Sequence, residues 1–254
     1  MRSKKLNIVI SVIPFLLIVV IWSLIPLTKW SNPFILPDLT SILTHLGDAI
    51  RTKTFWLDIE SSLVRVLTAF LLSAAIAIPF GLLASFSLTF SRVVEPLSEF
   101  IRYLPVPAFV PLFIMWFGLN DWFMIATIFT GTAFQLILMV SDIGREVDPD
   151  YYASDNTLGA KLRQIYNKIL WPAALPQVVN ACRIAIGWAW TYLIVAEIAN
   201  SGNEAHGLGF RILESMRVAQ TYKIFSGIMV IGLIGILTDQ VFRLIHRLSF
   251  RWIQ

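Results

Sequence analysis

The chain alternates between long apolar runs and shorter polar segments. Each apolar run approaches or exceeds about 20 residues, the length that an α-helix needs to cross the roughly 30 Å hydrocarbon core of a bilayer. We therefore predict an all-α polytopic membrane protein with six transmembrane helices. The expected spans cover residues 6–27, 63–88, 96–118, 122–143, 176–199 and 224–245.

The third run, 96–118, is interrupted by Pro105, Pro107 and Pro111. Proline has no backbone N–H, so nearby carbonyl groups lose their helical partners. We therefore predict a broken helix here. The break either shapes a pathway between the helices or is an ordinary packing kink, and the sequence favours neither.

The mixed segment 30–62, between the first two runs, is expected to hold one short amphipathic helix outside the bilayer. This pattern divides the chain into an N-terminal unit, 1–62, and a core, 63–254. The run at 6–27 follows basic residues, as a signal peptide would. It is longer than the 7–15 apolar residues of a signal peptide and lacks a small-residue cleavage site, so we interpret it as a retained span.

Composition supports the membrane assignment. Hydrophobic residues make up 57% of the chain and charged residues 14%, against about 45–50% and 25% in soluble proteins. The net charge of +4 fits the excess of Lys and Arg in cytoplasmic loops. No basic stretch is interleaved with aromatic residues, so we expect no nucleic-acid partner.

Lysine and arginine also predict the orientation. They are densest at the two termini and in the loop between the fourth and fifth spans. By the positive-inside rule, both termini and that loop are expected on the cytoplasmic side of the membrane.

The loop at 144–174 is long and polar, yet it carries one apolar stripe at helical spacing. The stripe consists of Leu158, Leu162, Ile165 and Ile169. Gly159 weakens a helix by about 1 kcal/mol relative to alanine and predicts a bend between two short helices. From the pattern alone, the loop is either a docking element or an amphipathic helix on the membrane surface.

This loop resembles the cytoplasmic coupling loop of ABC importer permeases. That pattern reads Glu-Ala-Ala, three variable residues, Gly, nine variable residues, Ile, one variable residue, Leu-Pro. Gly159, Ile169 and Pro172 match it, whereas Trp171 replaces the leucine. The Glu-Ala-Ala positions hold Ala-Ser-Asp, which moves the acid two residues, to Asp155, and about 200° around a helix.

The resemblance implies that the loop forms paired coupling helices, which dock in a groove of a separate ATPase subunit. The residues that it places at this contact are Asp155, Leu158, Gly159, Ala160, Ile169 and Pro172. The chain has no Gly-x-x-x-x-Gly-Lys-Ser/Thr motif, so ATP and Mg²⁺ would be used by the partner ATPase. We expect no catalytic, cofactor or metal site in this chain.

Other stretches resemble the nitrate, sulfonate, taurine and bicarbonate subgroup of these permeases. They are Arg102–Leu112 with Trp116–Gly118, Arg183–Ala185 with Ala196–Ile198, and Gly207–Phe210. The resemblance implies import of a small anion delivered by an external binding protein or lipoprotein. It also implies two ATPase subunits, a second permease copy or a homologue, and a place in a bacterial plasma (inner) membrane. Nitrate, bicarbonate and sulfonates remain equal candidates.

Polar groups and helix breaks inside spans are candidates for a translocation pathway. Glu197 either lines the pathway, pairs with a basic residue such as Arg211 or Arg217, or caps a helix end. Thr132 and Gln135 either face a pore or form interhelical hydrogen bonds. The pathway candidates are Arg102, Pro105, Pro107, Thr132, Gln135 and Glu197.

Two other classes compete with the importer. A secondary carrier would show internal repeats and acidic residues in mid-span, and we find neither in the sequence. A membrane enzyme would cluster its catalytic residues, whereas the three histidines lie in separate segments. The carrier is kept as the alternative.

Overall fold

The computed structural model describes residues 13–14, 16–25, 34–147, 168, 170–200 and 206–250. Within these ranges every regular element is a helix, which confirms the predicted all-α class. The elements are α2 (Leu39–Ala49), α3 (Lys53–Phe86), α4 (Leu88–Tyr103), the 3-10 helix η2 (Val106–Phe109), α5 (Val110–Phe117), α6 (Asp121–Arg145), α9 (Trp171–Ala199), α10 (Leu208–Arg217) and α11 (Thr221–Ser249).

Four of these helices, α3, α6, α9 and α11, are long and apolar enough to cross a membrane. They cover the predicted second, fourth, fifth and sixth runs. The short helix expected in the segment 30–62 is α2. Of the first run, 6–27, the structure describes only residues 13–14 and 16–25, so the count of six spans stays a prediction.

The third run is broken, as its prolines predict. It consists of α4 followed by η2 and α5, which together qualify as one span bent by 91°. Leu104, at the break, has extended backbone angles of φ −75° and ψ 138°. A following proline disfavours the helical conformation, and Pro105 is that proline. The structure also starts α4 at Leu88, earlier than the predicted start at 96.

Helix α3 begins at Lys53, ten residues before the predicted start at 63. The side chain of Thr52 caps it by accepting a hydrogen bond from the backbone N–H of Phe55 at 3.4 Å. The expected boundary between units 1–62 and 63–254 therefore falls inside one helix. Hydropathy placed the start too late because the first turns of α3 are polar.

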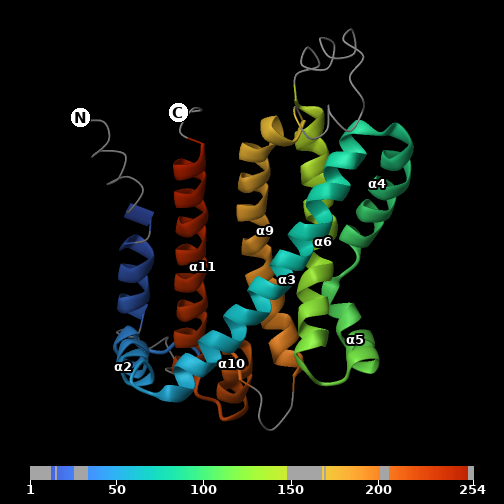
Figure 1. Cartoon of the computed structure of the whole chain (residues 1–254). Helices are drawn as coiled ribbons and strands as arrows, with labels where there is room; N and C mark the ends of the chain where they lie inside the picture. Colours follow the sequence, from blue (N-terminus) through green and yellow to red (C-terminus); the bar gives the residue numbers. More distant parts are fainter. Residues whose placement is uncertain are drawn as a thin grey trace, which may run out of the picture.

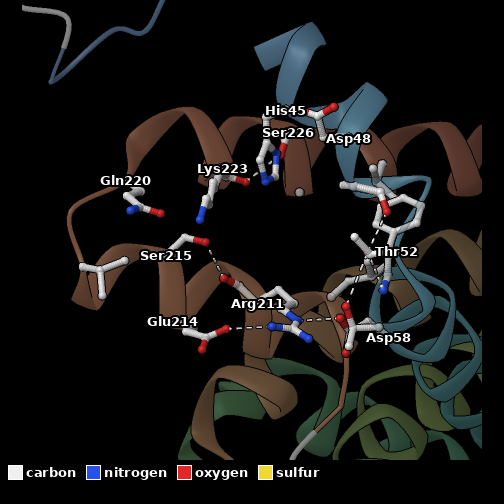
Figure 2. A pocket seen from close by; sticks show the side chains of 17 residues that line it. His45, Asp48, Thr52, Asp58, Arg211, Glu214, Ser215, Gln220, Lys223 and Ser226 are labelled. Atoms are coloured by element: carbon white, nitrogen blue, oxygen red, sulfur yellow. Dashed lines mark hydrogen bonds and ion pairs between the residues drawn. The ribbon is translucent and has the colours of Figure 1, made fainter. Parts of the chain in front are cut away.

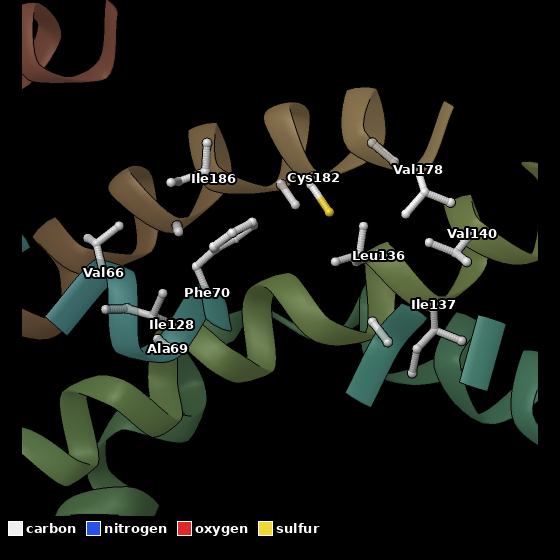
Figure 3. Close-up of a cluster of buried hydrophobic side chains, with 14 of the residues drawn as sticks. Val66, Ala69, Phe70, Ile128, Leu136, Ile137, Val140, Val178, Cys182 and Ile186 are labelled. Atoms are coloured by element: carbon white, nitrogen blue, oxygen red, sulfur yellow. The ribbon is translucent and has the colours of Figure 1, made fainter. Parts of the chain in front are cut away.

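The core lies where α3, α6 and α9 meet (Figure 3). Val66, Ile128 and Ile186 contribute to it from these three helices in turn. A Cβ atom at Gly81 would lie 2.6 Å from the Cβ of Val140, so only glycine allows α3 and α6 to approach so closely there. Small residues at helix contacts are typical of membrane proteins, where helices associate mainly through packing.

The helices have two distinct ends (Figure 1). At one end, α6 stops, α9 starts, α3 turns into α4, and α11 finishes. We call it the α6–α9 end. At the opposite end lie α2, α10 and the start of α3. We call it the α10 end.

Candidate functional site

A small cavity of about 140 Å³ opens where α4, η2, α6 and α9 meet. Two of the pathway candidates, Arg102 and Gln135, come together in its lining. Trp188 and Tyr192 of α9 form part of its wall. Among the residues that the structure describes, no carboxylate lines this cavity, so the Arg102 guanidinium gives it a positive charge.

Arg102 lies in the last turn of α4 and is exposed. Its Nη2 donates a hydrogen bond to the Tyr103 hydroxyl at 3.2 Å, and its Cζ lies 5.0 Å from the centre of the Tyr103 ring. Neither contact neutralises the charge. The guanidinium therefore retains donors that an anion in the cavity can use.

Thr132 does not share the cavity with Gln135. Its hydroxyl is buried, donates to the carbonyl of Ile128 at 2.8 Å and lies 2.7 Å from the Ser73 hydroxyl of α3. Of the two roles considered for Thr132, the geometry matches the interhelical hydrogen bond.

Pro105 and Pro107 lie at the bend between α4 and α5 and are exposed. The Pro105 carbonyl accepts a hydrogen bond from the N–H of Ala108 at 2.8 Å, which starts the 3-10 turn. This turn puts Val106, between the two prolines, into the cavity lining. The prolines thus shape the cavity without lining it.

Glu197 is buried near the α10 end, in an ionic network between α3, α9 and α10. Its Oε1 accepts hydrogen bonds from Arg65 Nη1 and from the Ser62 hydroxyl, each at 2.8 Å. Its Oε2 accepts from the N–H of Gly209 at 2.7 Å. Of the alternatives for Glu197, pairing with a basic residue matches the structure, but the partner is Arg65 of α3 and not Arg211 or Arg217.

Arg211 pairs instead with Asp58, also on α3, at 2.5 Å. Asp58 accepts in addition from the N–H of Gly207 at 3.1 Å. Gly207 has φ +150°, and a Cβ there would overlap the carboxylate of Glu197, so the turn requires glycine. Asp58 and Glu197 together hold the start of α10 against α3.

A larger cavity, of about 540 Å³, lies at the α10 end between α2, α3, α10 and α11 (Figure 2). Figure 2 shows Arg211 pointing between Asp58 and Glu214, with His45 and Lys223 on the opposite side. Both signs of charge line this cavity, so its lining does not select one sign of ligand.

A second polar cluster ties α4 to α6 at the α6–α9 end. Arg145, in the last turn of α6, pairs with Glu95 of α4 at 2.5 Å. The Ser141 hydroxyl donates to the same carboxylate oxygen at 2.6 Å, and that of Ser91 donates to Glu95 Oε2 at 2.9 Å. The end of α6 is therefore tied directly to α4, seven residues before Arg102.

Most of the predicted coupling residues lie outside the described residues. They are Asp155, Leu158, Gly159, Ala160 and Ile169. Pro172 is described: it sits in the first turn of α9 and is exposed. Proline is favoured at this position because its missing N–H has no helical partner there in any case.

Three residues of the Glu197 network, Asp58, Ser62 and Arg65, escaped the sequence analysis. Arg65 did carry a signal, because it is an arginine at the beginning of an apolar run and the predicted fifth span contains a carboxylate near its end. Matching the two charges would have predicted that α3 and α9 pack together.

The chain is similar in sequence to permeases of several transport systems. It is 31% identical over 235 residues to a putative aliphatic sulfonates transport permease of Bacillus subtilis, covering 92% of this chain and 84% of that protein. It is 27% identical to the taurine transport system permease of Escherichia coli, and the alignment covers 98% of this chain and 91% of that protein. It is 30% identical to a bicarbonate transport system permease of Synechococcus elongatus, and the alignment covers 78% of this chain and 70% of that protein.

Solved structures agree with this fold. The inward-facing methionine ABC transporter MetNI superposes with a TM-score of 0.67 at 20% identity, covering 76% of this chain and 95% of that one. A bacterial ABC transporter involved in the import of the acidic polysaccharide alginate also superposes with a TM-score of 0.67. The identity is 14%, and the match covers 97% of this chain and 94% of that one.

The family model for the inner membrane component of binding-protein-dependent transport systems matches residues 77–251. This match takes in the bent third span, the polar loop after α6, and helices α9 to α11. The chain therefore belongs to this family, the membrane-embedded permeases of ABC importers.

Proposed function

We propose that this permease forms half of the translocation pathway of an ATP-driven importer for a small oxyanion or organic sulfonate. A second copy of the chain, or a homologue, supplies the other half. The support comes from relatives that are named for sulfonates, taurine and bicarbonate and that align over most of this chain. Nitrate remains a candidate only because the sequence motifs resemble the subgroup that includes nitrate permeases.

The cavity at Arg102 and Gln135 is the proposed passage for the anion. The observation that carries this proposal is the uncompensated guanidinium in a cavity without a carboxylate among the described residues. A guanidinium donor attracts an anion through charge-assisted hydrogen bonds, which are stronger than those between neutral groups. Pro105 and Pro107 set the bend that forms the rim, and Thr132 and Glu197 hold the surrounding helices in place.

ATP hydrolysis is proposed to take place on two separate ATPase subunits that dock at the loop 144–174. Both helices that flank this loop, α6 and α9, have their loop ends on the same side of the molecule. Closure of the ATPase pair would move the end of α6. Through the ion pair between Arg145 and Glu95, that movement would reach α4 and the cavity at Arg102.

The α6–α9 end then faces the cytoplasm together with both termini, and the α10 end faces an external binding protein. One of the similar solved structures is an alginate transporter in complex with a periplasmic protein, which supports a partner on that side. We propose that the 540 Å³ cavity between α2, α10 and α11 belongs to this outer surface. The alternative, a carrier without an ATPase, is not favoured by the family match.

The test is uptake into vesicles by the purified importer with ATP, Mg²⁺ and the binding protein. Radiolabelled taurine, bicarbonate and nitrate are compared in turn. Arg102→Gln should slow uptake of the transported anion about tenfold, the effect of losing one charged hydrogen bond. Arg102→Lys should retain part of the rate, and Arg92→Gln, an exposed arginine elsewhere on α4, should retain all of it. Full uptake by Arg102→Gln would contradict the proposed passage.

A further inference from the structure

The cavity at Arg102 contains three further polar side chains that have no partner in the protein. Gln135 of α6 and both Trp188 and Tyr192 of α9 line it. None of these three side chains forms a hydrogen bond with another residue that the structure describes. Thr130, in the same lining, differs, because its hydroxyl donates to a backbone carbonyl one turn earlier at 2.8 Å.

Two of the unpartnered groups lie deep in their helices. Gln135 and Trp188 are each about ten residues or more from both ends of α6 and α9, which is about 15 Å at 1.5 Å per residue. Acyl chains at this depth offer no hydrogen bond, and a polar group left without one costs free energy. The contents of the cavity, water or a ligand, therefore supply the missing partners.

The position of Tyr192 is fixed by the backbone of α6. A Cβ atom at Gly131 would lie 2.3 Å from Cδ2 of Tyr192, so the ring rests directly on this glycine. Trp188 precedes Tyr192 by one turn of α9, about 6 Å along the helix. Donor groups from α6 and α9 thus border one small space, in addition to the guanidinium group of Arg102 on α4.

The chemistry of these groups suits an anion with several oxygens. The indole N–H can only donate a hydrogen bond, and the amide and the phenol can also donate one. A guanidinium group attracts any anion through its charge, including a halide. Neutral donors at separate points distinguish between anions, because an oxyanion presents several acceptor atoms and chloride presents one centre. A site built to hydrogen-bond a group rejects an analogue that lacks it.

We propose that the side chains of Trp188 and Tyr192 donate hydrogen bonds to the transported oxyanion and select it over chloride. The inference rests on the proposed function, since it concerns the same cavity. In this division of roles, Arg102 attracts the anion and α9 discriminates between anions. Neither Trp188 nor Tyr192 was among the pathway candidates from the sequence.

The test is chloride inhibition of uptake by the importer in vesicles, with ATP, Mg²⁺ and the same binding protein for every variant. The substrate is whichever of radiolabelled taurine, bicarbonate and nitrate the unchanged importer takes up. Chloride is raised at constant ionic strength, and its inhibition constant is compared with the KM of the oxyanion. Trp188→Phe and Tyr192→Phe should each shift this ratio about fivefold towards chloride, the effect of losing one neutral hydrogen bond.

Two matched controls keep the same chemistry elsewhere. Trp122→Phe and Tyr222→Phe change residues that do not line this cavity, and both should keep the ratio of the unchanged importer. Arg102→Gln should weaken the binding of both anions and leave the ratio unchanged, because the oxyanion and chloride both depend on the positive charge.

The outcomes separate this inference from the proposed function. Slower uptake by Trp188→Phe and Tyr192→Phe at an unchanged ratio would assign them a packing role and overturn the inference. An unchanged ratio with normal uptake would overturn it as well, while slow uptake by Arg102→Gln would leave the proposed passage intact. Full uptake by Arg102→Gln, or no uptake of the three oxyanions by the unchanged importer, would contradict the proposed function and this inference with it.

Discussion

Arg65 of α3 and Glu197 of α9 form an ion pair of 2.8 Å, with side chains only 8% and 1% exposed. The pair joins residues 132 positions apart in the sequence. Arg65 Nη1 also donates to the carbonyl of His206 at 2.6 Å, and Glu197 accepts the N–H of Gly209. Buried charges are tolerated when their hydrogen bonds are satisfied in this way, so the pair fixes α10 against α3 and α9.

Breaking this pair should therefore be costly. Arg65→Met leaves Glu197 buried without its cation, and we expect a loss of about 3–5 kcal/mol in the free energy of unfolding. The measurement is denaturant unfolding of the purified chain in detergent micelles. Arg51→Gln, an exposed arginine before α3, is the control and should change stability little. Equal effects of the two substitutions would show that the pair does not stabilise the fold.

A second prediction concerns Gly131, which lines the Arg102 cavity. A methyl group at this position would overlap the ring of Tyr192 on α9. Gly131→Ala should therefore displace Tyr192, lower stability by about 1–3 kcal/mol and slow anion uptake. Gly187→Ala on α9 is the control, because nothing lies within 4 Å of a Cβ atom there. Normal uptake and stability in Gly131→Ala would contradict the observed packing.

The ion pair and the bend mark the limit of what the sequence can predict. The long helices α3, α6, α9 and α11 were among the six predicted spans, because crossing a bilayer requires that length and composition. The prolines predict a break, and Leu104 takes the conformation that Pro105 favours. The 91° angle is set by packing between distant segments, which local patterns do not contain.

The same reasoning explains why the sequence did not identify Arg65 as the partner of Glu197. In sequence, Arg211 and Arg217 are its nearest basic residues on the C-terminal side, and Arg65 lies in another span. Only the packing of α3 on α9 decides between them. The start of α3 was misplaced for a related reason: Asp58 is polar but is satisfied by α10, so it sits inside the helix rather than before it.

The third prediction tests the link between α6 and α4. Glu95→Gln removes the ion pair with Arg145, which is partly exposed and should contribute only about 1 kcal/mol or less to stability. If the pair transmits the movement of the coupling loop, the substitution should reduce ATP-driven uptake about fivefold while ATPase binding is kept. Glu99→Gln, an exposed residue one turn later, is the control. Uptake that matches the control would exclude this route.

The fourth prediction concerns the pH dependence of α2. The Ser226 hydroxyl donates to the carbonyl of Lys223 at 2.9 Å, so His45 Nδ1, 2.9 Å from Ser226 Oγ, acts as the donor between them. Burial, followed by the positive charge of Lys223, lowers the pKa of His45, and Asp48 opposes this in part. The folded state therefore favours the neutral imidazole.

Because the folded pKa lies below the unfolded one, the stability linked to His45 is complete at neutral pH. It is lost as pH falls below the unfolded pKa of about 6.5 towards the folded pKa. The protection factors of the α2 amides, which compare their hydrogen exchange with that of an unstructured chain at the same pH, should fall over this range. His45→Gln keeps a donor without titrating and should abolish the change. An unaltered pH response in that variant would assign the effect to another group.

The central claim is that this permease works with a separate ATPase docked at the loop after α6. The most direct measurement is purification from the native membrane, with mass spectrometry of the proteins that co-elute. A P-loop ATPase should co-elute with the unchanged chain and with Gly159→Ala, and it should be lost with Gly159→Arg, which puts a bulky charge at the predicted contact. A chain that elutes without an ATPase, or a Gly159→Arg variant that keeps it, would contradict the account.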